Sequence, residues 1–260
     1  LFDGAPIYTG APGSASLKGR ALKGGVVALG GFGAAQAIRL ASNLIMTRLL
    51  APDAFGLMAV VLAIEILIGM LSDLGLDASI VRSKRGAEPE FLATARTMQL
   101  ARALFIALTM VMAAAAIPPL VAAGFFPKGS VYADPRLPWF MALMALSVVI
   151  AGFNAMRVAL HNRSLNLIPV VRLELAAQTI GVAATVAGAL AGFGAYSLAV
   201  GGVIGASAKT LGSHFFLSGP PARFGFDRAH FKEIFGYGKW LLLASTLGWL
   251  VQRGDQVLFG

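Results

Sequence analysis

The sequence predicts an all-α fold, a polytopic membrane helix bundle, and three observations lead to this fold class. The 260 residues are 57% hydrophobic and 13% charged, with a mean hydropathy of +0.77, whereas a soluble domain has about 25% charged residues. The charges are clustered between apolar runs of about 20 residues, the length that crosses hydrocarbon. These runs lack the alternation of barrel strands, and in lipid a helix satisfies its own backbone hydrogen bonds.

The apolar runs divide the chain into a tail, a six-helix unit, a connection and one further helix. We expect a disordered cytoplasmic tail over 1–21, the six-helix unit over 22–216, a cytoplasmic connection over 217–236 and the first helix of a second unit over 237–260. Because the last run is still apolar at Gly260, we expect further spans after it. The seven predicted spans cover residues 24–47, 54–71, 97–121, 137–158, 168–190, 196–216 and 240 onward.

Basic residues give the bundle an orientation. With the N-terminus in the cytoplasm, sixteen of the 21 Lys and Arg residues fall on the cytoplasmic side. Three fall outside, at Arg48, Lys128 and Arg136, and Arg39 and Arg253 lie within spans. This is a strong positive-inside bias. It accounts for the net charge of +9 without a nucleic-acid partner. In the connection, the segment "DRAHFKEIF" has the pattern of an amphipathic helix lying on the membrane surface.

The residue types give no catalytic or metal-binding set. The chain has no cysteine, which excludes thiolate ligands and Cys nucleophiles. The histidines His161, His214 and His230 all map to cytoplasmic ends of spans. Asp73 and Asp77 flank the helix-breaking sequence "SDLGLD", where we expect a structural role. We therefore predict neither an enzyme nor a bound cofactor.

Polar residues inside the first span form one stripe. Gln36, Arg39, Asn43 and Thr47 follow helical spacing, so they share a face. An ionisable residue at membrane depth costs roughly 2.5–3.5 kcal/mol on insertion scales. The stripe is therefore expected to line a wet cavity, and interhelical hydrogen bonding is the other interpretation.

Other spans carry isolated charges. Glu65 stands alone in "GLMAVVLAIEILIGML" and is expected to be protonated or paired with an arginine. Arg172 opens the fifth span, where a long side chain can snorkel to the interface. Arg253 and Asp255 in the seventh span are about 200° apart around the helix and cannot pair within it. Asp255 therefore needs a partner on another helix or binds a cation.

Two glycine pairs have the small-xxx-small spacing of close helix packing. Gly188 and Gly192 lie at the end of the fifth span, and Gly201 and Gly205 lie in the sixth. The spacing predicts that these two spans pack closely against each other.

Several segments, taken together, resemble the Wzx-type polysaccharide flippases of the multidrug/oligosaccharidyl-lipid/polysaccharide exporter superfamily. "TRLLAPDAFGLMAV" and "LSDLGLDASIVRSK" look like the region of the first two spans, and "AGFGAYSLAVGGVIG", "RFGFDRAHFKEIFGYG" and "VQRGDQVLFG" follow in the same order. The similarity extends from about residue 18 to residue 260. It implies a MATE-like architecture of two six-helix lobes around a central cavity, of which this chain holds one lobe and the first helix of the next.

The resemblance also implies a function and a set of site residues. Such proteins move a lipid-linked oligosaccharide across the bacterial inner membrane, and a polysaccharide polymerase and export machinery are possible further partners. Arg39 is the first candidate for contacting the substrate diphosphate, followed by Arg253 and Arg172, with Asn43 and Gln36 on the same stripe as Arg39. Asp255 matches an acidic residue that takes part in cation coupling in relatives, and Glu65 is a second candidate for Na⁺ or H⁺ coupling.

One alternative keeps the same fold. A cation-coupled multidrug antiporter of this superfamily would require an acidic rather than a basic cavity, and Arg39 on the stripe favours an anionic substrate. A glycan polymerase or ligase would need a large outer loop with catalytic groups, and the predicted outer connections are short.

Overall fold

A computed structural model describes the backbone of residues 17–127, 129–221 and 223–259. The surroundings of individual residues are described for 19, 22–127, 129–221 and 223–244. Within these residues the chain is helical and contains no strand, so the all-α fold class is confirmed. The elements are α1 (Leu17–Leu49), α2 (Pro52–Leu71), α3 (Leu76–Arg82), α4 (Pro89–Ala122), a 3₁₀ turn (Val131–Ala133), α5 (Leu137–Gly152), α6 (Arg157–Arg163), α7 (Leu167–Leu190), α8 (Tyr196–Phe215) and α9 (Arg228–Phe259).

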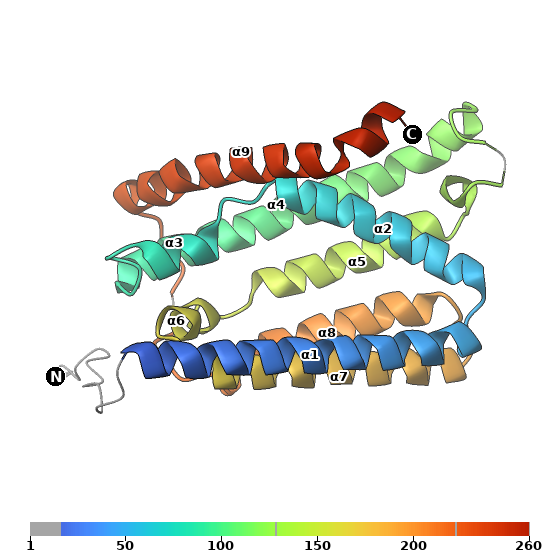
Figure 1. Ribbon diagram of the computed structural model, residues 1–260. Coiled ribbons are helices and arrows are strands. Elements are labelled where there is room, and N and C mark those ends of the chain that lie inside the picture. Colours follow the sequence, from blue (N-terminus) through green and yellow to red (C-terminus); the bar gives the residue numbers. More distant parts are fainter. Residues whose placement is uncertain (1–16, 128, 222, 260) are drawn as a thin grey trace.

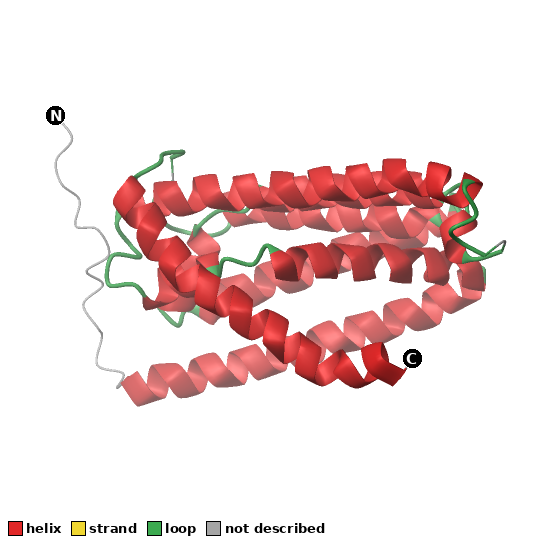
Figure 2. Cartoon of the chain, turned by 90° about the horizontal axis from the view of Figure 1, so that it is seen from above, coloured by secondary structure: helices red, strands yellow, loops and turns green. Residues whose placement is uncertain are grey.

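The long helices run roughly parallel or antiparallel, so all connections lie at two ends of one bundle (Figure 1). The start of α1, the short helices α3 and α6 and the start of α9 share one end, which we call the cytoplasmic end in keeping with the predicted orientation. Helix α7 packs against α8, α8 against α5, α5 against α4, and α1 against α7. Figure 2, seen from above, shows the same elongated bundle. Helices α1 and α2 diverge from their shared turn at the outer end (Figure 1).

Each of the seven predicted spans overlaps a helix, but not all of these helices have the length and composition of a membrane span. Among the described residues, four helices are long and apolar enough to cross a membrane, namely α1, α2, α4 and α7. A fifth span is obtained if α5 and α6 are counted as one bent pair. Helix α8 contains Gly, Ser and Lys in "GASAKTLGSH" and falls outside this group. The seven-span count therefore stays a prediction.

The fourth predicted span, 137–158, is not one continuous helix. Helix α5 ends at Gly152, and α6 starts at Arg157 at an angle of 61°. Side chains of neighbouring helices satisfy the backbone at this break: the Gln99 amide donates to the carbonyls of Gly152 (2.9 Å) and Asn154 (3.1 Å). The backbone N–H of Ala155 donates to Ser213 Oγ at 2.9 Å. The break is stable because these side chains replace the missing helical partners.

Two helix starts also differ from the prediction. Helix α1 begins at Leu17, so 17–21 is helical rather than part of a tail. "DRAHFKEIF" is not a separate surface helix, because α9 begins at Arg228 and continues as one helix. Asp227 caps this start by accepting hydrogen bonds from the N–H groups of Ala229 and His230, both at 2.9 Å. The bond from His230 contributes most to holding the pKa of Asp227 below its usual value.

Two apolar cores hold the bundle together. The larger joins α1, α2, α4, α5 and α8 in the outer half, with Val61, Met110 and Phe140 fully buried in it. The smaller lies at the cytoplasmic end, where Phe91, Ile80 and Ile234 bring together α4, α3 and α9. Full burial of such a side chain contributes about 1.5–3 kcal/mol of transfer free energy.

Glycines bring α7 and α8 into close contact, as their spacing predicted. A Cβ at Gly201 would meet Thr185 Oγ1 and would lie 2.8 Å from the Gly181 carbonyl oxygen. A Cβ at Gly181 would lie 3.2 Å from Gly205 Cα. Gly192 belongs instead to the turn after α7, with a φ of +85° and open space around it. The contact therefore depends on Gly181, Gly188, Gly201 and Gly205, and the prediction for Gly192 is wrong.

We expect Gly201→Ala to destabilise the bundle. The added methyl group forces α7 and α8 apart where they touch, and overpacking of this kind costs about 1–3 kcal/mol. Thermal unfolding in detergent should show a lower Tm. Gly202→Ala is the matched control, because its Cβ would meet Met144 Sδ at an ordinary 3.5 Å. Equal Tm values for the two variants would show that the glycine contact does not limit stability.

Candidate functional site

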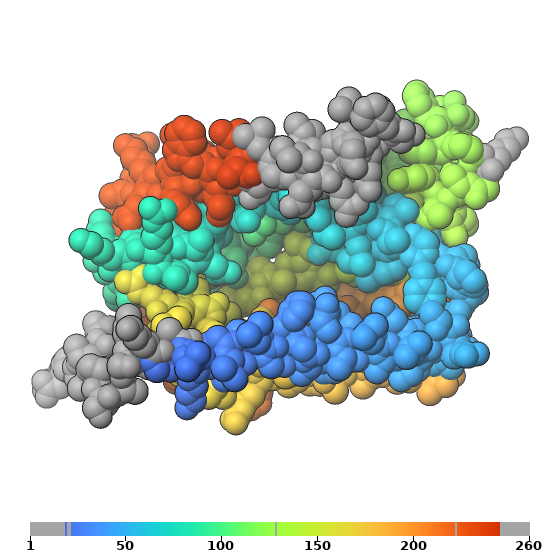
Figure 3. Space-filling view, viewed as in Figure 1, coloured from blue at the N-terminus to red at the C-terminus, as the bar shows by residue number. Residues whose placement is uncertain are grey.

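A groove of about 880 Å³ lies between α1 and the α7–α8 pair. The molecule is visibly hollowed between α1 and the helices above it, with α5 at the floor of the hollow (Figure 3). One face of α1, one face of α7 and the glycine-rich face of α8 line the groove, and Met58 of α2 joins them. The lining residues are Ala28, Gly31, Phe32, Ala35, Arg39, Ser42, Asn43, Met58, Val171, Glu174, Leu175, Ala177, Gln178, Gly181, Val182, Thr185, Gly201, Gly202, Gly205, Ala206 and Lys209.

Small residues and one amide hold α1 against α7. Gly31 leaves no room for a side chain, because a Cβ there would collide with Val171. The Gln178 amide donates a hydrogen bond of 3.0 Å to the carbonyl oxygen of Ala35. The lining residues of α1 recur at helical spacing, so they present one continuous face to the groove.

Half of the predicted polar stripe faces this groove. Arg39 and Asn43 line it, and the sequence analysis missed Ser42 beside them. Gln36 is exposed but does not line the groove. Thr47 is also outside it and donates its hydroxyl to the carbonyl of Leu44 at 3.0 Å. The stripe was defined by spacing alone, whereas the packing of α1 against α7 decides which part of that face is enclosed.

An ion pair crosses the cytoplasmic part of the groove. Lys209 Nζ of α8 lies 3.1 Å from Glu174 Oε1 of α7. Lys209 was counted only among the basic residues at the cytoplasmic ends of spans, and the structure shows that it lies within α8 and lines the groove. The signal that could have identified it is a lone lysine in an otherwise uncharged helix, since such a residue needs a partner.

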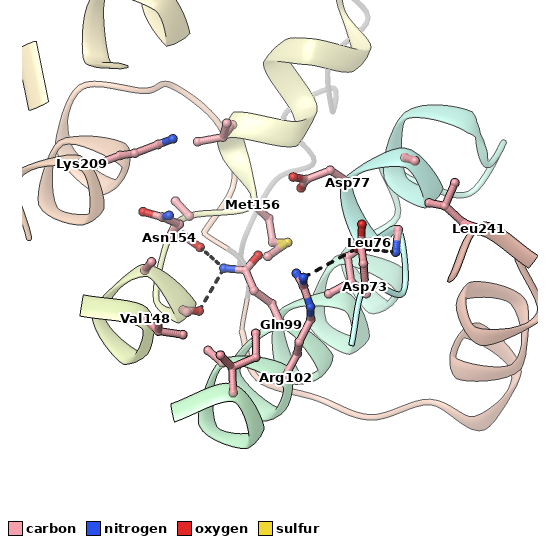
Figure 4. Close-up of a pocket in the computed structure, with 18 residues that line it drawn as sticks. Asp73, Leu76, Asp77, Gln99, Arg102, Val148, Asn154, Met156, Lys209 and Leu241 are labelled. Carbon is pink, nitrogen blue, oxygen red and sulfur yellow. Dashed lines mark hydrogen bonds and ion pairs between the residues drawn. The ribbon is translucent and has the colours of Figure 1, made fainter. Parts of the chain in front are cut away.

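A second cavity, of about 500 Å³, opens between the two apolar cores at the cytoplasmic end (Figure 4). Its walls come from α3, α4, the broken end of α5, and α8. The polar residues that line it are Asp73, Asp77, Gln99, Arg102, Asn154 and Lys209 (Figure 4). Gln99 spans it to reach the carbonyls at the α5 break.

Arg102 is committed to the end of α2. Its Nη2 donates to the Gly69 carbonyl at 3.0 Å and lies 3.9 Å from Asp73 Oδ1, and its Nε lies 3.4 Å from Ser72 Oγ. The guanidinium therefore satisfies one carbonyl and one hydroxyl where α2 ends and α3 has not begun. Asp73 has the structural role that we expected.

Among the described residues Asp77 has no such partner, and it lines the cavity. Its carboxyl reaches the open part of the cavity, yet the protein packed around it displaces water and raises its pKa. The positive charges of Lys209 and Arg102 act against this rise, and the negative charge of Asp73 adds to it.

The structure separates the remaining predicted site residues. Arg172 is exposed near the start of α7 and lines neither cavity. Glu65 is half-buried in α2, and its Oε2 atom is buried without a hydrogen-bond partner among the described side chains. It lies two turns along the helix from Met58, on the same face. Arg253 and Asp255 belong to the last part of α9, whose side chains lie outside the described residues.

The fold defines the class of protein first: a multi-pass membrane protein with polar cavities enclosed by its helices. Comparison with known families then gives the family. Residues 45–260 match the model of the family described as "Polysaccharide biosynthesis protein", so the chain belongs to this family. Its members are polysaccharide-related transporters or flippases, and the predicted resemblance is confirmed at this level. No curated protein and no solved structure gave a significant match.

If water reaches the groove, a cysteine on the groove face of α1 should be more reactive than a cysteine on the opposite face of the same helix. The chain has no native cysteine, so single substitutions report without background. We expect Ser42→Cys, inside the groove, to react with a membrane-impermeant thiol reagent, because only hydrated thiols ionise readily. Leu44→Cys is the control, since Leu44 is exposed on the outside of the same turn of α1. Equal labelling of both positions in membranes would contradict a groove that water reaches and lipid does not.

Proposed function

We propose that this protein moves a polyprenyl-diphosphate-linked oligosaccharide from the cytoplasmic to the outer face of the bacterial inner membrane during assembly of surface polysaccharide. Membership of the polysaccharide biosynthesis family, together with a groove inside a helical bundle that carries Arg39 beside hydroxyl and amide groups, carries this proposal. The transport proceeds by alternating access, with the groove exposed to each side in turn.

The physical problem that such a protein solves matches the features of the groove. A sugar diphosphate loses its hydration on entering about 30 Å of hydrocarbon, and burying unpaired charge is very costly. A groove with hydroxyl, amide and guanidinium groups replaces water as the partner of the headgroup, while the apolar tail stays in lipid. Ser42, Asn43 and Gln178 supply the neutral polar groups, and Arg39 supplies a positive charge.

Charge favours an anionic substrate over a drug cation. Among the described lining residues, the ionisable groups of the groove are Arg39, Glu174 and Lys209. Glu174 and Lys209 neutralise each other, whereas Arg39 makes no hydrogen bond or ion pair within the described part of the chain. A guanidinium presents a donor fork that fits phosphate oxygens.

The proposed orientation has the N-terminus in the cytoplasm. The predicted cytoplasmic basic residues of α3, α6 and the start of α9 gather at one end of the bundle (Figure 1). This end also carries the polar cavity that the substrate would meet first.

We expect Arg39→Ala to reduce export of surface polysaccharide at least tenfold while leaving the amount of membrane-inserted protein unchanged. A charge-assisted hydrogen bond to phosphate contributes about 1.5–3 kcal/mol, so its loss weakens headgroup binding by roughly one to two orders of magnitude. Export in cells that depend on this protein is the measurement. Arg48→Ala removes a cation from the end of the same helix, outside the groove, and should export normally. Normal export by Arg39→Ala would remove Arg39 from the site.

We further propose that a cation, Na⁺ or H⁺, drives the cycle, with Asp255 and Glu65 as the coupling carboxylates. The membrane potential supplies about 2.3 kcal/mol per charge per 100 mV, enough to bias alternating access. The unpartnered Oε2 atom of Glu65 supports its candidacy, because such an atom gains a partner when a proton or cation binds.

Asp255→Asn should make transport less dependent on the ion gradient, because an amide cannot exchange a charge with the cation. Transport into vesicles, measured with and without an imposed gradient, tests this. Gln256→Asn, at the neighbouring position of the same helix, is the control. An unchanged response of Asp255→Asn to the gradient would indicate a structural role for Asp255.

A further inference from the structure

The ion pair between Lys209 and Glu174 is placed where a headgroup would pass. Glu174 is the eighth residue of α7, so it lies about 10 Å from the cytoplasmic start of that helix at 1.5 Å per residue. Lys209 approaches it from α8 to 3.1 Å. A lysine at this depth is costly without a partner, and Glu174 supplies that partner in the structure.

Lys209 connects the two cavities. It is the residue that lines both the cytoplasmic cavity and the groove among the described side chains, whereas Glu174 lines the groove. The pair is not sealed, since the side chains retain 36% and 51% of their exposure. A ligand arriving from the cytoplasmic cavity can therefore reach the ammonium group. In Figure 4, Lys209 extends from α8 into this cavity, on the side opposite Arg102.

The charged residues around Lys209 leave donors of its ammonium group available to a ligand. Arg102 is occupied by Gly69, Ser72 and Asp73. Asp77 of α3 interacts electrostatically with Lys209 across the cavity but forms no ion pair with it in the described structure. An ammonium group has three donors, and Glu174 takes one of them at 3.1 Å.

We propose that Lys209 changes partners during transport, leaving Glu174 to bind a phosphate of the lipid-linked substrate as the headgroup passes from the cytoplasmic cavity into the groove. This inference rests on the proposed function. The exchange replaces one charge-assisted hydrogen bond with another, so the lysine is neutralised both before and after it. Arg39, farther along the groove, is then the next cation on the path.

A purely neutralising ion pair would behave differently under mutation. If Glu174 competes with phosphate for Lys209, removing the carboxylate should tighten anion binding, and removing the lysine should weaken it. If the pair only offsets buried charge, the two single changes should lower stability alike and leave anion binding unchanged. The two roles thus differ in whether Glu174→Gln tightens anion binding.

The experiment measures binding of geranylgeranyl diphosphate to the purified protein in detergent by calorimetry, with geranylgeraniol as the probe that lacks phosphate. Lys209→Met should bind the diphosphate about tenfold more weakly, and Glu174→Gln should bind it several-fold more tightly. Lys209→Arg, which keeps the charge, should stay close to wild type. Lys232→Met is the matched control, because Lys232 is exposed on α9 and lines neither cavity.

The double variant Lys209→Met with Glu174→Gln keeps the proposal testable if a single variant does not fold. This variant leaves no unpaired charge at the two positions, so it should fold. If the exchange occurs, it should bind the diphosphate as weakly as Lys209→Met does. Wild-type binding by the double variant, or weaker binding by a folded Glu174→Gln, would overturn the exchange while the proposed function stands. If the wild-type protein binds the diphosphate no better than the alcohol, the proposed function and the exchange both fail.

Discussion

The rest of the structure depends on one constraint: a polar group surrounded by apolar helices needs a partner. The helices meet this requirement for most of the backbone, and side chains meet it where a helix is interrupted. Gln99 bonds the carbonyls at the broken end of α5, and Arg102 bonds the Gly69 carbonyl near the end of α2. Within the bundle, Lys209 and Glu174 satisfy each other. Both interruptions border the cytoplasmic cavity, so the constraint also determines where polar space can exist.

The close contact between α7 and α8 and the open groove beside them involve the same glycines. The glycines of α7 and α8 let the two backbones approach, and their flat joint surface forms one wall of the groove. Helix α1 forms the other wall, held to α7 by Gly31 and by the hydrogen bond from Gln178. Met58 of α2 also borders the groove, although α1 and α2 diverge from their shared turn (Figure 1).

The cations of the two cavities differ in how firmly they are held. Arg102 has several partners at the end of α2, so it supports the fold. Lys209 has one carboxylate partner, and Arg39 has none within the described residues. This gradation follows the proposed path from the cytoplasmic cavity into the groove. It suits the proposed transport, in which an anionic headgroup must be bound and released again.

The sequence by itself determined the helical membrane fold, the approximate positions of the long helices, the clustering of basic residues at one end and the glycine contact of Gly201 and Gly205. These features follow from composition and local periodicity, which each segment carries within itself. The tertiary structure alone decided that Arg39 and Asn43 face the groove while Gln36 does not, that Lys209 meets Glu174, and that α5 breaks at Gly152. Spacing defines the faces of one helix, but the partner of each face depends on how residues distant in sequence pack together.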